Sequence, residues 1–199
     1  MAQRIIKSNI DNYIRETYGE IQDRVSIRVY GIYSLLQEDF SGSNDCTLTT
    51  LTEMTRFYAN LYNLEDEQST YNRIKDVAKK FCYTDGYGTF SITINRITNK
   101  VNQLYGINRK SKGAYFKGVG YNIQTIIKNI QQKTPMILNM LNDGRGYYKN
   151  HSVTVVGYAD YLVNGKHIYM LELHDNWSPI STFVDYQKLS FISSINYCK

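Results

Sequence analysis

Two β-rich segments near the C-terminus constrain the fold of this chain most strongly. They read "HSVTVVGYA" and "HIYMLELHD", and between them lies "DYLVNG". The Asn164-Gly165 pair is a strong signal for a two-residue hairpin turn. We therefore predict two neighbouring antiparallel strands, and the register between them decides which polar side chains meet, because side chains on a strand alternate between its faces.

The register of this hairpin has two candidates. A tight turn would place His151 and Asp175 on opposite faces unless a bulge intervened. A second register sets Val153 against Leu173 and His151 against Asp175, and leaves 160–166 as a wider loop. A slip of one residue would turn the whole apolar row away from the core, so we predict the second register.

The part of the chain before this hairpin has mostly helical periodicity. Apolar residues recur at steps of three and four in five stretches, which are about 10–24, 46–61, 69–82, 91–105 and 122–132. The segment "SIRVYGIYSLL" favours β-structure, and Pro135 opens a further expected strand in "KTPMILNML". Helices followed by an antiparallel sheet predict an α+β fold. We expect a single domain over 1–199, with a helical part at about 1–132 and a sheet part at about 133–199.

Composition excludes several classes of protein. The chain has 199 residues, which suits one globular domain, and its net charge of +5 is spread without a dense basic block, so no nucleic-acid partner is expected. No apolar run is long enough to span a membrane, and no secretory signal is visible. We expect a cytoplasmic protein, or a domain or mature form of a longer exported one. The 19 tyrosines, with abundant Asn, Ile and Lys, suggest a bacterial, AT-rich genome.

The cysteines and histidines do not suggest a metal site. The three cysteines, Cys46, Cys82 and Cys198, form no CxxC pair, so neither a disulfide framework nor a zinc site is expected. Cys82 follows an apolar row and is expected in the core, and Cys198 is expected to have no functional role. His167 and His174 lie on opposite faces of one strand, which excludes shared coordination.

Cys46 stands where a polar loop meets a predicted helix. Asp45 precedes it as a candidate N-cap. The free N–H groups and partial positive charge of a helix start favour a thiolate and lower the pKa of the thiol, as a nucleophile requires. The other interpretation is a small buried residue that happens to begin a helix.

His151 and Asp175 supply the other groups that thiol catalysis needs. A general base at the entry of one strand needs an acceptor on its second ring nitrogen, and Asp175 at the end of the next strand is a candidate. Each residue alone is common at strand ends. Together with Cys46, and in this order along the chain, the two residues indicate a site for thiol catalysis.

Several of these segments resemble a known superfamily. "NHSVTVVGY" is similar to the histidine segment of papain-like cysteine peptidases, and "DNW" is similar to that fold's closing segment. The "NDC" before a helix, the "TPMIL" strand and an Asp as third member resemble bacterial double-glycine leader peptidases and their stand-alone relatives. The resemblance covers 37–58, 134–141 and 150–177, whereas the helices at 69–132 match none of these segments and are interpreted as a lineage insertion.

The resemblance implies roles for individual residues. Cys46 would be the nucleophile, His151 the general base and acid, and Asp175 the orienting group. The oxyanion donor would be Gln37, nine residues before the nucleophile, or else Asn44 or backbone N–H groups alone. The small residue and Trp that often follow the nucleophile in the papain branch are absent from "CTLT".

Two further residues, Asn176 and Trp177, are expected to support this site. Asn176 would form hydrogen bonds within it, and Trp177 would pack over the histidine. The implied fold is a helical lobe, with the nucleophile helix packed against a twisted antiparallel sheet.

The expected function is hydrolysis of a peptide or protein substrate through a thioester acyl-enzyme. No metal or organic cofactor and no membrane partner are expected. Two alternatives stay open: a transglutaminase-like acyl transferase with the same Cys, His and Asp, and a catalytically inactive papain-like binding domain. The sequence defines neither the cleavage site nor the oligomeric state.

Overall fold

The computed structural model of the chain describes residues 5–6, 9–40, 44–140 and 150–199. The helices in this part are α1 (Ile10–Tyr18), α2 (Cys46–Ala59), α3 (Glu67–Ala78), α4 (Ile94–Leu104) and α5 (Ile123–Gln131), with short 3₁₀ turns at Gln37–Asp39, Lys79–Phe81 and Tyr186–Lys188. The strands are β1 (Ile5–Ile6), β2 (Ile21–Arg28), β3 (Ser111–Phe116), β4 (Met136–Met140), β5 (His151–Val163), β6 (Lys166–His174), β7 (Thr182–Asp185) and β8 (Ser194–Cys198). The predicted α+β class is confirmed.

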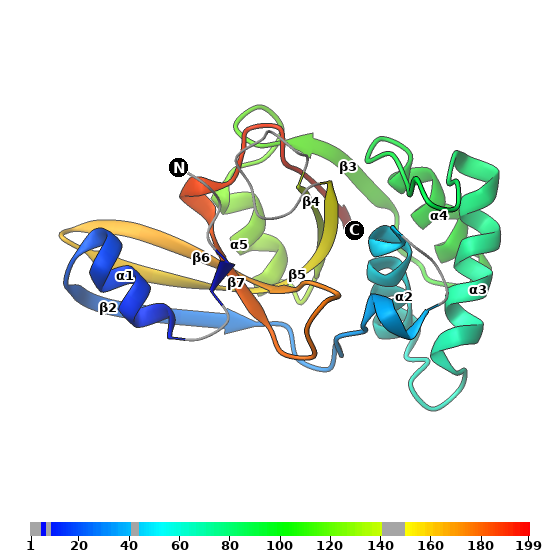
Figure 1. Cartoon of the computed structure of the whole chain (residues 1–199), viewed down its shortest axis with the longest axis horizontal. Coiled ribbons are helices and arrows are strands. Elements are labelled where there is room, and N and C mark those ends of the chain that lie inside the picture. The colour runs from blue at the N-terminus through cyan, green and yellow to red at the C-terminus, as the bar shows by residue number, and fades with distance from the viewer. Residues whose placement is uncertain (1–4, 7–8, 41–43, 141–149) are drawn as a thin grey trace.

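The strands form one antiparallel sheet with the order β1-β7-β6-β5-β4-β8-β3. The long strand β5 is its centre. On one edge β5 pairs with β6, and on the other it pairs first with β4 and then, further along, with β2. The first residues of β5 therefore lie in the middle of the sheet, beside the helical part of the molecule (Figure 1).

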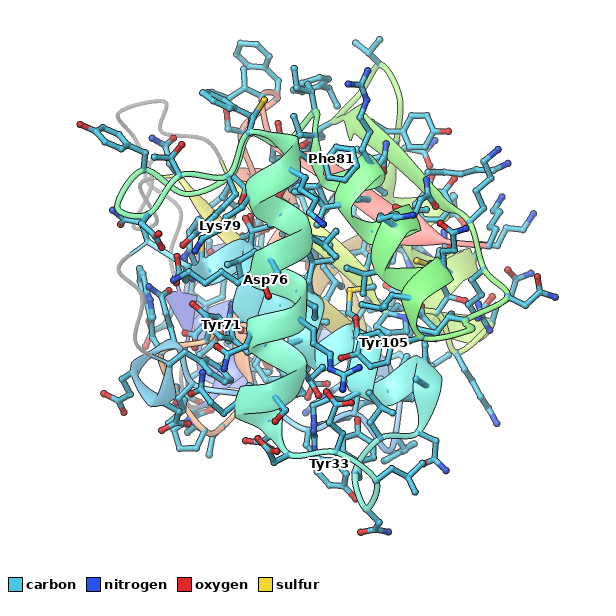
Figure 2. The ribbon with its side chains drawn as sticks, turned by 90° about the vertical axis from the view of Figure 1, so that its right-hand side faces the viewer. Tyr33, Tyr71, Asp76, Lys79, Phe81 and Tyr105 are labelled. Carbon is cyan, nitrogen blue, oxygen red and sulfur yellow. The ribbon has the colours of Figure 1, made fainter. Side chains whose placement is uncertain are left out.

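Three apolar clusters hold the helices in place. At one end of the molecule α2, α3 and α4 pack around a core that includes Leu51, Ile74 and Ile97 (Figure 1). The middle of the sheet packs against α5 through Ile126 and Ile130. At the far end α1 covers the outer half of the β5–β6 hairpin. Figure 2 shows α3 along the outer side of the helical end.

Helix α2 is enclosed on all sides. Every residue from Cys46 to Arg56 is buried, including five threonines and Glu53. Two threonine hydroxyls in its first turns donate hydrogen bonds to backbone carbonyl oxygens one turn back. Thr49 donates to Asp45 at 3.1 Å, and Thr52 donates to Leu48 at 2.8 Å. The polar side chains allow this helix to lie between the sheet and the other two helices of its cluster.

The predicted order of elements is corrected in two places. The helix expected over 10–24 ends at Tyr18, because Gly19 with φ of 113° closes it, and the chain continues as strand β2. The polar connection after α4 contains strand β3, so the first 132 residues contribute three strands to the sheet as well as the five described helices. The sequence "DGRG" at 143–146 favours a turn between β4 and β5, and it lies outside the described residues.

The predicted hairpin register is wrong, and a bulge explains why. The turn is tight, with Val163 opposite Lys166, so the wider loop expected over 160–166 does not form. Between Val155, which faces Leu173, and Gly157, the register shifts by one residue. This bulge allows Val155 and Val156 to be buried together. It also shifts the pairing of the first part of β5 with β6 by one residue, to Val155 opposite Leu173 and Thr154 opposite His174.

The bulge restores the geometry that a regular tight hairpin forbids. Beyond it Thr154 faces His174, so Asp175 follows directly after the end of β6, on the same side of the sheet as His151. A glycine is required after the bulge, because a Cβ on Gly157 would lie 2.7 Å from the backbone oxygen of Ile27.

Candidate active site

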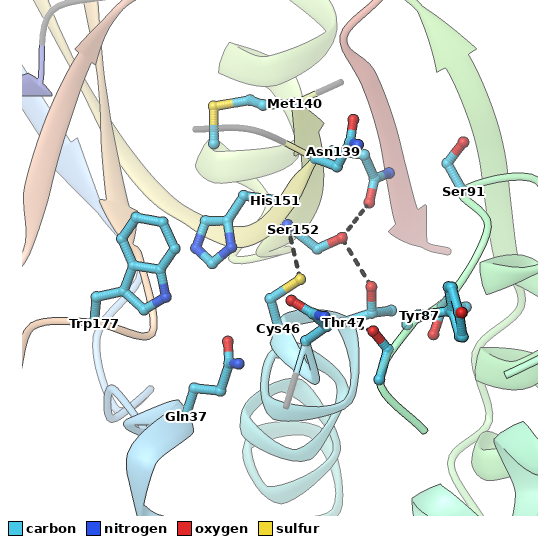
Figure 3. A pocket seen from close by; sticks show the side chains of 15 residues that line it. Gln37, Cys46, Thr47, Tyr87, Ser91, Asn139, Met140, His151, Ser152 and Trp177 are labelled. Carbon is cyan, nitrogen blue, oxygen red and sulfur yellow. Dashed lines mark hydrogen bonds between the residues drawn. The ribbon is translucent and has the colours of Figure 1, made fainter. Parts of the chain in front are cut away.

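A pocket of about 370 Å³ opens where the start of α2 meets the sheet (Figure 3). Its walls come from α2, from the facing ends of β4 and β5, and from the loop that follows α3. The described residues that line it are Gln37, Asn44, Cys46, Thr47, Gly86, Tyr87, Gly88, Thr89, Ser91, Asn139, Met140, Asn150, His151, Ser152 and Trp177. Five of the seven predicted site residues are in this set, and Asp175 and Asn176 lie behind it.

Cys46 is the first residue of α2, and its sulfur points toward the His151 ring (Figure 3). The side chain is nearly enclosed, with 9% of the residue exposed. The backbone N–H of Ser152 donates to Sγ over 3.4 Å. Burial raises the pKa of the thiol, and the hydrogen bonds from Ser152 and Thr47 oppose this only in part. The expected lowering of the thiol pKa is therefore wrong for this enclosed state.

Asp45 occupies the N-cap position but does not cap the helix with its side chain. Its carboxylate instead accepts hydrogen bonds from the hydroxyls of Tyr71 and Tyr83, and Lys75 lies 3.6 Å from Oδ2. The capping role expected from the sequence is thus replaced by contacts with residues 26 to 38 positions further along the chain.

His151 is the first residue of β5 and is 4% exposed. Its Nε2 lies 2.7 Å from the backbone oxygen of Asp175. A carbonyl oxygen only accepts, so the ring proton lies on Nε2, and Nδ1 is the acceptor of the ring. Burial lowers the pKa of His151 to about 4, against the opposing effect of Asp175. At neutral pH this imidazole is uncharged.

Trp177 covers the histidine. Its indole stacks on the His151 ring with 4.1 Å between ring centroids and 29° between planes. The indole is itself 48% exposed, so it separates the imidazole from solvent. This is the packing expected for Trp177 from the sequence.

Asp175 contacts the imidazole through its main chain. Its carboxylate Oδ1 accepts the backbone N–H groups of Trp177 and Ser178 at 3.1 and 3.0 Å. This turn holds Trp177 in place over His151 and directs the Asp175 carbonyl at the ring. The negative charge of Asp175 also favours the protonated imidazole.

Asn176 joins helix α2 to the sheet. Its Nδ2 lies within hydrogen-bond distance of the Cys46 carbonyl at 3.1 Å, the Thr50 hydroxyl at 2.9 Å and the Ser152 carbonyl at 3.2 Å. Its own backbone carbonyl accepts the N–H of Gln37 at 2.8 Å. One residue thereby fixes the spacing of the thiol, the histidine strand and the segment that carries Gln37.

The two candidate oxyanion donors differ in what they contact. The side-chain amide of Gln37 points into the pocket between Cys46 and Trp177 (Figure 3). The amide of Asn44 donates to the Gly86 carbonyl at 2.6 Å. Asn44 therefore holds the loop after α3 against the start of α2, and Gln37 is the better placed side-chain donor.

Sequence reasoning missed a polar chain beneath the pocket. The Ser152 hydroxyl donates to Asn139 Oδ1 at 2.8 Å and lies 2.9 Å from the Thr47 hydroxyl (Figure 3). Asn139 in turn donates to Asn196 Oδ1 at 2.8 Å. A lone Asn within the apolar strand "MILNM" was the available signal, because a polar group in a buried strand requires a partner.

A second group that the sequence did not reveal is the buried pair of Glu53 and His174, with 2.7 Å between Oε1 and Nδ1. His167 is exposed and pairs with Asp160. Among the described residues no group of three His, Cys, Asp or Glu is arranged to hold a metal ion.

The other two cysteines lie outside the pocket. Cys82 is exposed, which corrects its expected place in the core, whereas Cys198 is buried beside Asn102.

The fold and the site define an α+β protein with a helix-borne thiol facing a strand-borne imidazole across a pocket. A family model described as Peptidase_C39 like family matches residues 30–188, and the chain belongs to this family. The family is of the papain-like cysteine peptidase type, and it agrees with the double-glycine peptidase resemblance. No curated protein sequence matches the chain. In the part of the chain that the structure describes, no helix has the length and apolar character to cross a membrane.

Proposed function

We propose that this protein is a cysteine peptidase that cleaves a peptide or protein substrate with Cys46, His151 and Asp175. The observation that carries the proposal is the hydrogen bond from His151 Nε2 to the Asp175 carbonyl. Because this bond takes the ring proton, Nδ1 is left to accept the proton of the Cys46 thiol in the same pocket.

The proposed reaction begins from a neutral thiol and a neutral imidazole. Burial raises the pKa of Cys46 and lowers the pKa of His151, so both groups are uncharged before substrate arrives. As Sγ attacks the substrate carbonyl carbon, the thiol proton moves to Nδ1 of His151. The imidazolium that forms is stabilised by the carbonyl and the negative charge of Asp175.

The oxyanion would be bound by the backbone N–H of Cys46 and the side-chain amide of Gln37. The first N–H groups of a helix have no partner within the helix, so that of Cys46 is suited to this role. The protonated His151 then gives its proton to the leaving amine as the C–N bond breaks. Water, deprotonated by His151, cleaves the thioester to release the acid and restore the thiol.

The proposal is tested by digesting a peptide library in H₂¹⁸O and sequencing the new termini by mass spectrometry. Wild type and Cys82→Ala are expected to generate ¹⁸O-labelled C-termini, and Cys46→Ala and His151→Ala to lose them. Added primary amine distinguishes hydrolysis from acyl transfer, because a transferase would give amide products without ¹⁸O. Cleavage by Cys46→Ala at the wild-type rate would refute the proposal.

A further inference from the structure

A buried carboxylate lies directly before the proposed nucleophile. Asp45 is almost fully enclosed, and its two oxygens accept the hydroxyls of Tyr71 and Tyr83, the latter at 2.5 Å. Burial and the neighbouring carboxylate raise the pKa of both phenols, so they remain protonated donors. The cation of Lys75 lies 3.6 Å from Asp45 and 5.7 Å from each of the two ring centroids.

This cluster joins two walls of the pocket, the start of α2 and the loop after α3, through helix α3 itself. Tyr71 and Lys75 come from α3, and Tyr83 lies just before the loop that lines the pocket with Gly86 and Gly88. Asp85 completes the set. Its Oδ1 lies 3.0 Å from the Tyr83 hydroxyl and 2.7 Å from the Lys75 ammonium group, and its Oδ2 lies 3.8 Å from that of Lys79.

The loop is held tightly against the start of α2. The Asn44 amide donates to Gly86, and a Cβ on Gly88 would lie 2.9 Å from the Asn44 backbone oxygen. The cluster therefore fixes both the start of the nucleophile helix and the pocket wall that faces it. All of its members except Asp45 come from residues 71–85, which lie within the range 30–188 that the family model matches.

The charge of Asp45 has a chemical consequence for its neighbour. A negative charge next to a thiol disfavours the thiolate, and a nearby cation offsets that effect. Among the described residues Lys75 is the cation that pairs with the Asp45 carboxylate, at 3.6 Å, so it is the group that compensates this charge.

We propose that Asp45 is a positioning residue for the Cys46 nucleophile, and that Lys75 is the charge partner that keeps its carboxylate from suppressing the thiolate. The inference rests on Cys46 acting as the nucleophile. Two functions are combined: the carboxylate anchors the helix start through two phenols, and the ammonium group balances its charge.

The molecule contains a matched control. Asp185, also fully buried, accepts hydrogen bonds from Tyr13 at 2.8 Å and from Tyr18, and Lys188 lies 3.9 Å from it. The Lys188 and Lys75 side chains are 17% and 15% exposed. Tyr13 and Tyr18 belong to α1, at the opposite end of the molecule from α2 (Figure 1). Loss of Lys188 should therefore remove the cation from a similar buried carboxylate without an effect on Cys46.

The test measures the rate of Cys46 alkylation by iodoacetamide from pH 6 to 10, with peptide mapping and exposed Cys82 as internal reference. Lys75→Met is expected to slow Cys46 alkylation about fivefold at pH 8, the order expected for one unit charge in a partly buried site. Asp45→Asn is expected to speed it about fivefold while kcat for peptide cleavage falls and KM stays within twofold. The double variant should return to near the wild-type alkylation rate, and Lys188→Met should leave it unchanged.

The opposite signs distinguish this inference from simple loosening of the fold. If Lys75→Met and Asp45→Asn both change Cys46 alkylation in the same direction, or if Lys188→Met changes it as much as Lys75→Met does, the inference is overturned. If Lys75→Met does not fold, the single variants Tyr83→Phe and Asp45→Asn are compared instead. The first removes a hydrogen bond that anchors Asp45, and the second removes its charge. Failure of the proposed function would be seen in a different experiment, because peptide cleavage would then persist in Cys46→Ala.

Discussion

Replacement of His174 by leucine would leave a carboxylate buried without its partner. Glu53 and His174 are both enclosed, and 2.7 Å separates Oε1 from Nδ1. On the other side of the ring the guanidinium of Arg28 lies 3.3 Å from Nε2. A guanidinium only donates, so Nε2 accepts, and the ring proton lies on Nδ1, from which it is donated to Glu53.

The cost of this change follows from burial. Removal of the donor that faces a buried carboxylate costs about 3–5 kcal/mol, because the carboxylate charge stays desolvated without compensation. Glu53→Gln is milder, at about 1 kcal/mol, since its amide oxygen still accepts from His174. Burial raises the pKa of Glu53, so ionised Glu53 costs stability as the pH rises through its folded value, and the cost vanishes below about 4.5, where both states are protonated. The penalty of His174→Leu should therefore be larger at pH 8 than at pH 5.

Urea unfolding at the two pH values measures this effect. The control is His167→Leu, because the exposed pair of His167 and Asp160 at 2.9 Å should contribute less than about 1 kcal/mol. The double variant Glu53→Gln with His174→Leu should cost less than the sum of the single changes. A penalty for His174→Leu below about 1 kcal/mol, or one that is equal at both pH values, would refute the reasoning.

Four further outcomes are expected. The pH profile of kcat/KM should fall on the acid side near the pKa of His151, about 4, and stay level up to pH 9, because burial raises the pKa of Cys46. Asp175→Asn keeps the turn and the carbonyl but removes the negative charge, so kcat should fall less than tenfold, whereas Asp175→Ala also loses the turn and should lower kcat at least tenfold in a steady-state assay. Gln37→Ala should lower kcat by about 10²–10³ with little change in KM. Gly157→Ala should destabilise the fold by about 2–4 kcal/mol in urea unfolding, because its Cβ would lie 2.7 Å from a backbone oxygen of β2.

The local periodicities predicted the elements that surround the site. The apolar spacing after Cys46 predicted α2, and the two β-rich segments predicted β5 and β6. Both signals are strong because they arise from burial of a continuous face. The α1 boundary was wrong because a single glycine, Gly19, outweighs the helical spacing that continues beyond it.

The hairpin register could not be obtained from pattern alone. Two rules conflicted, the tight turn and the burial of aliphatic pairs, and each was assumed to act along a regular strand. The bulge before Gly157 satisfies both, since the turn stays tight while Val155 and Val156 are both buried. At the bulge Gly157 also pairs with Arg28 of β2, and β2 was not predicted beside this strand.

The role of Asp45 was hidden for a different reason. A carboxylate before a helix is typical of an N-cap, and the competing partners are phenols on α3 and just beyond it. Tertiary hydrogen bonds outweighed a local one. The same limit applies to Glu53, which reads as a solvated helix position until His174 is brought to it by the sheet.

The polar residues of α2 connect these observations. A helix that carried only Leu48, Leu51 and Met54 would pack against α3 and α4 but would be free to slide along the sheet. Attachments of α2 at three levels prevent this: Asp45 at its first turn, Thr50 through Asn176, and Glu53 through His174. Each is directional and buried, so each fixes the helix along its axis as well as in distance. The thiol at the start of such a helix faces the imidazole in one fixed position. The proposed mechanism requires this, because it starts from two neutral groups that no ion pair draws together beforehand.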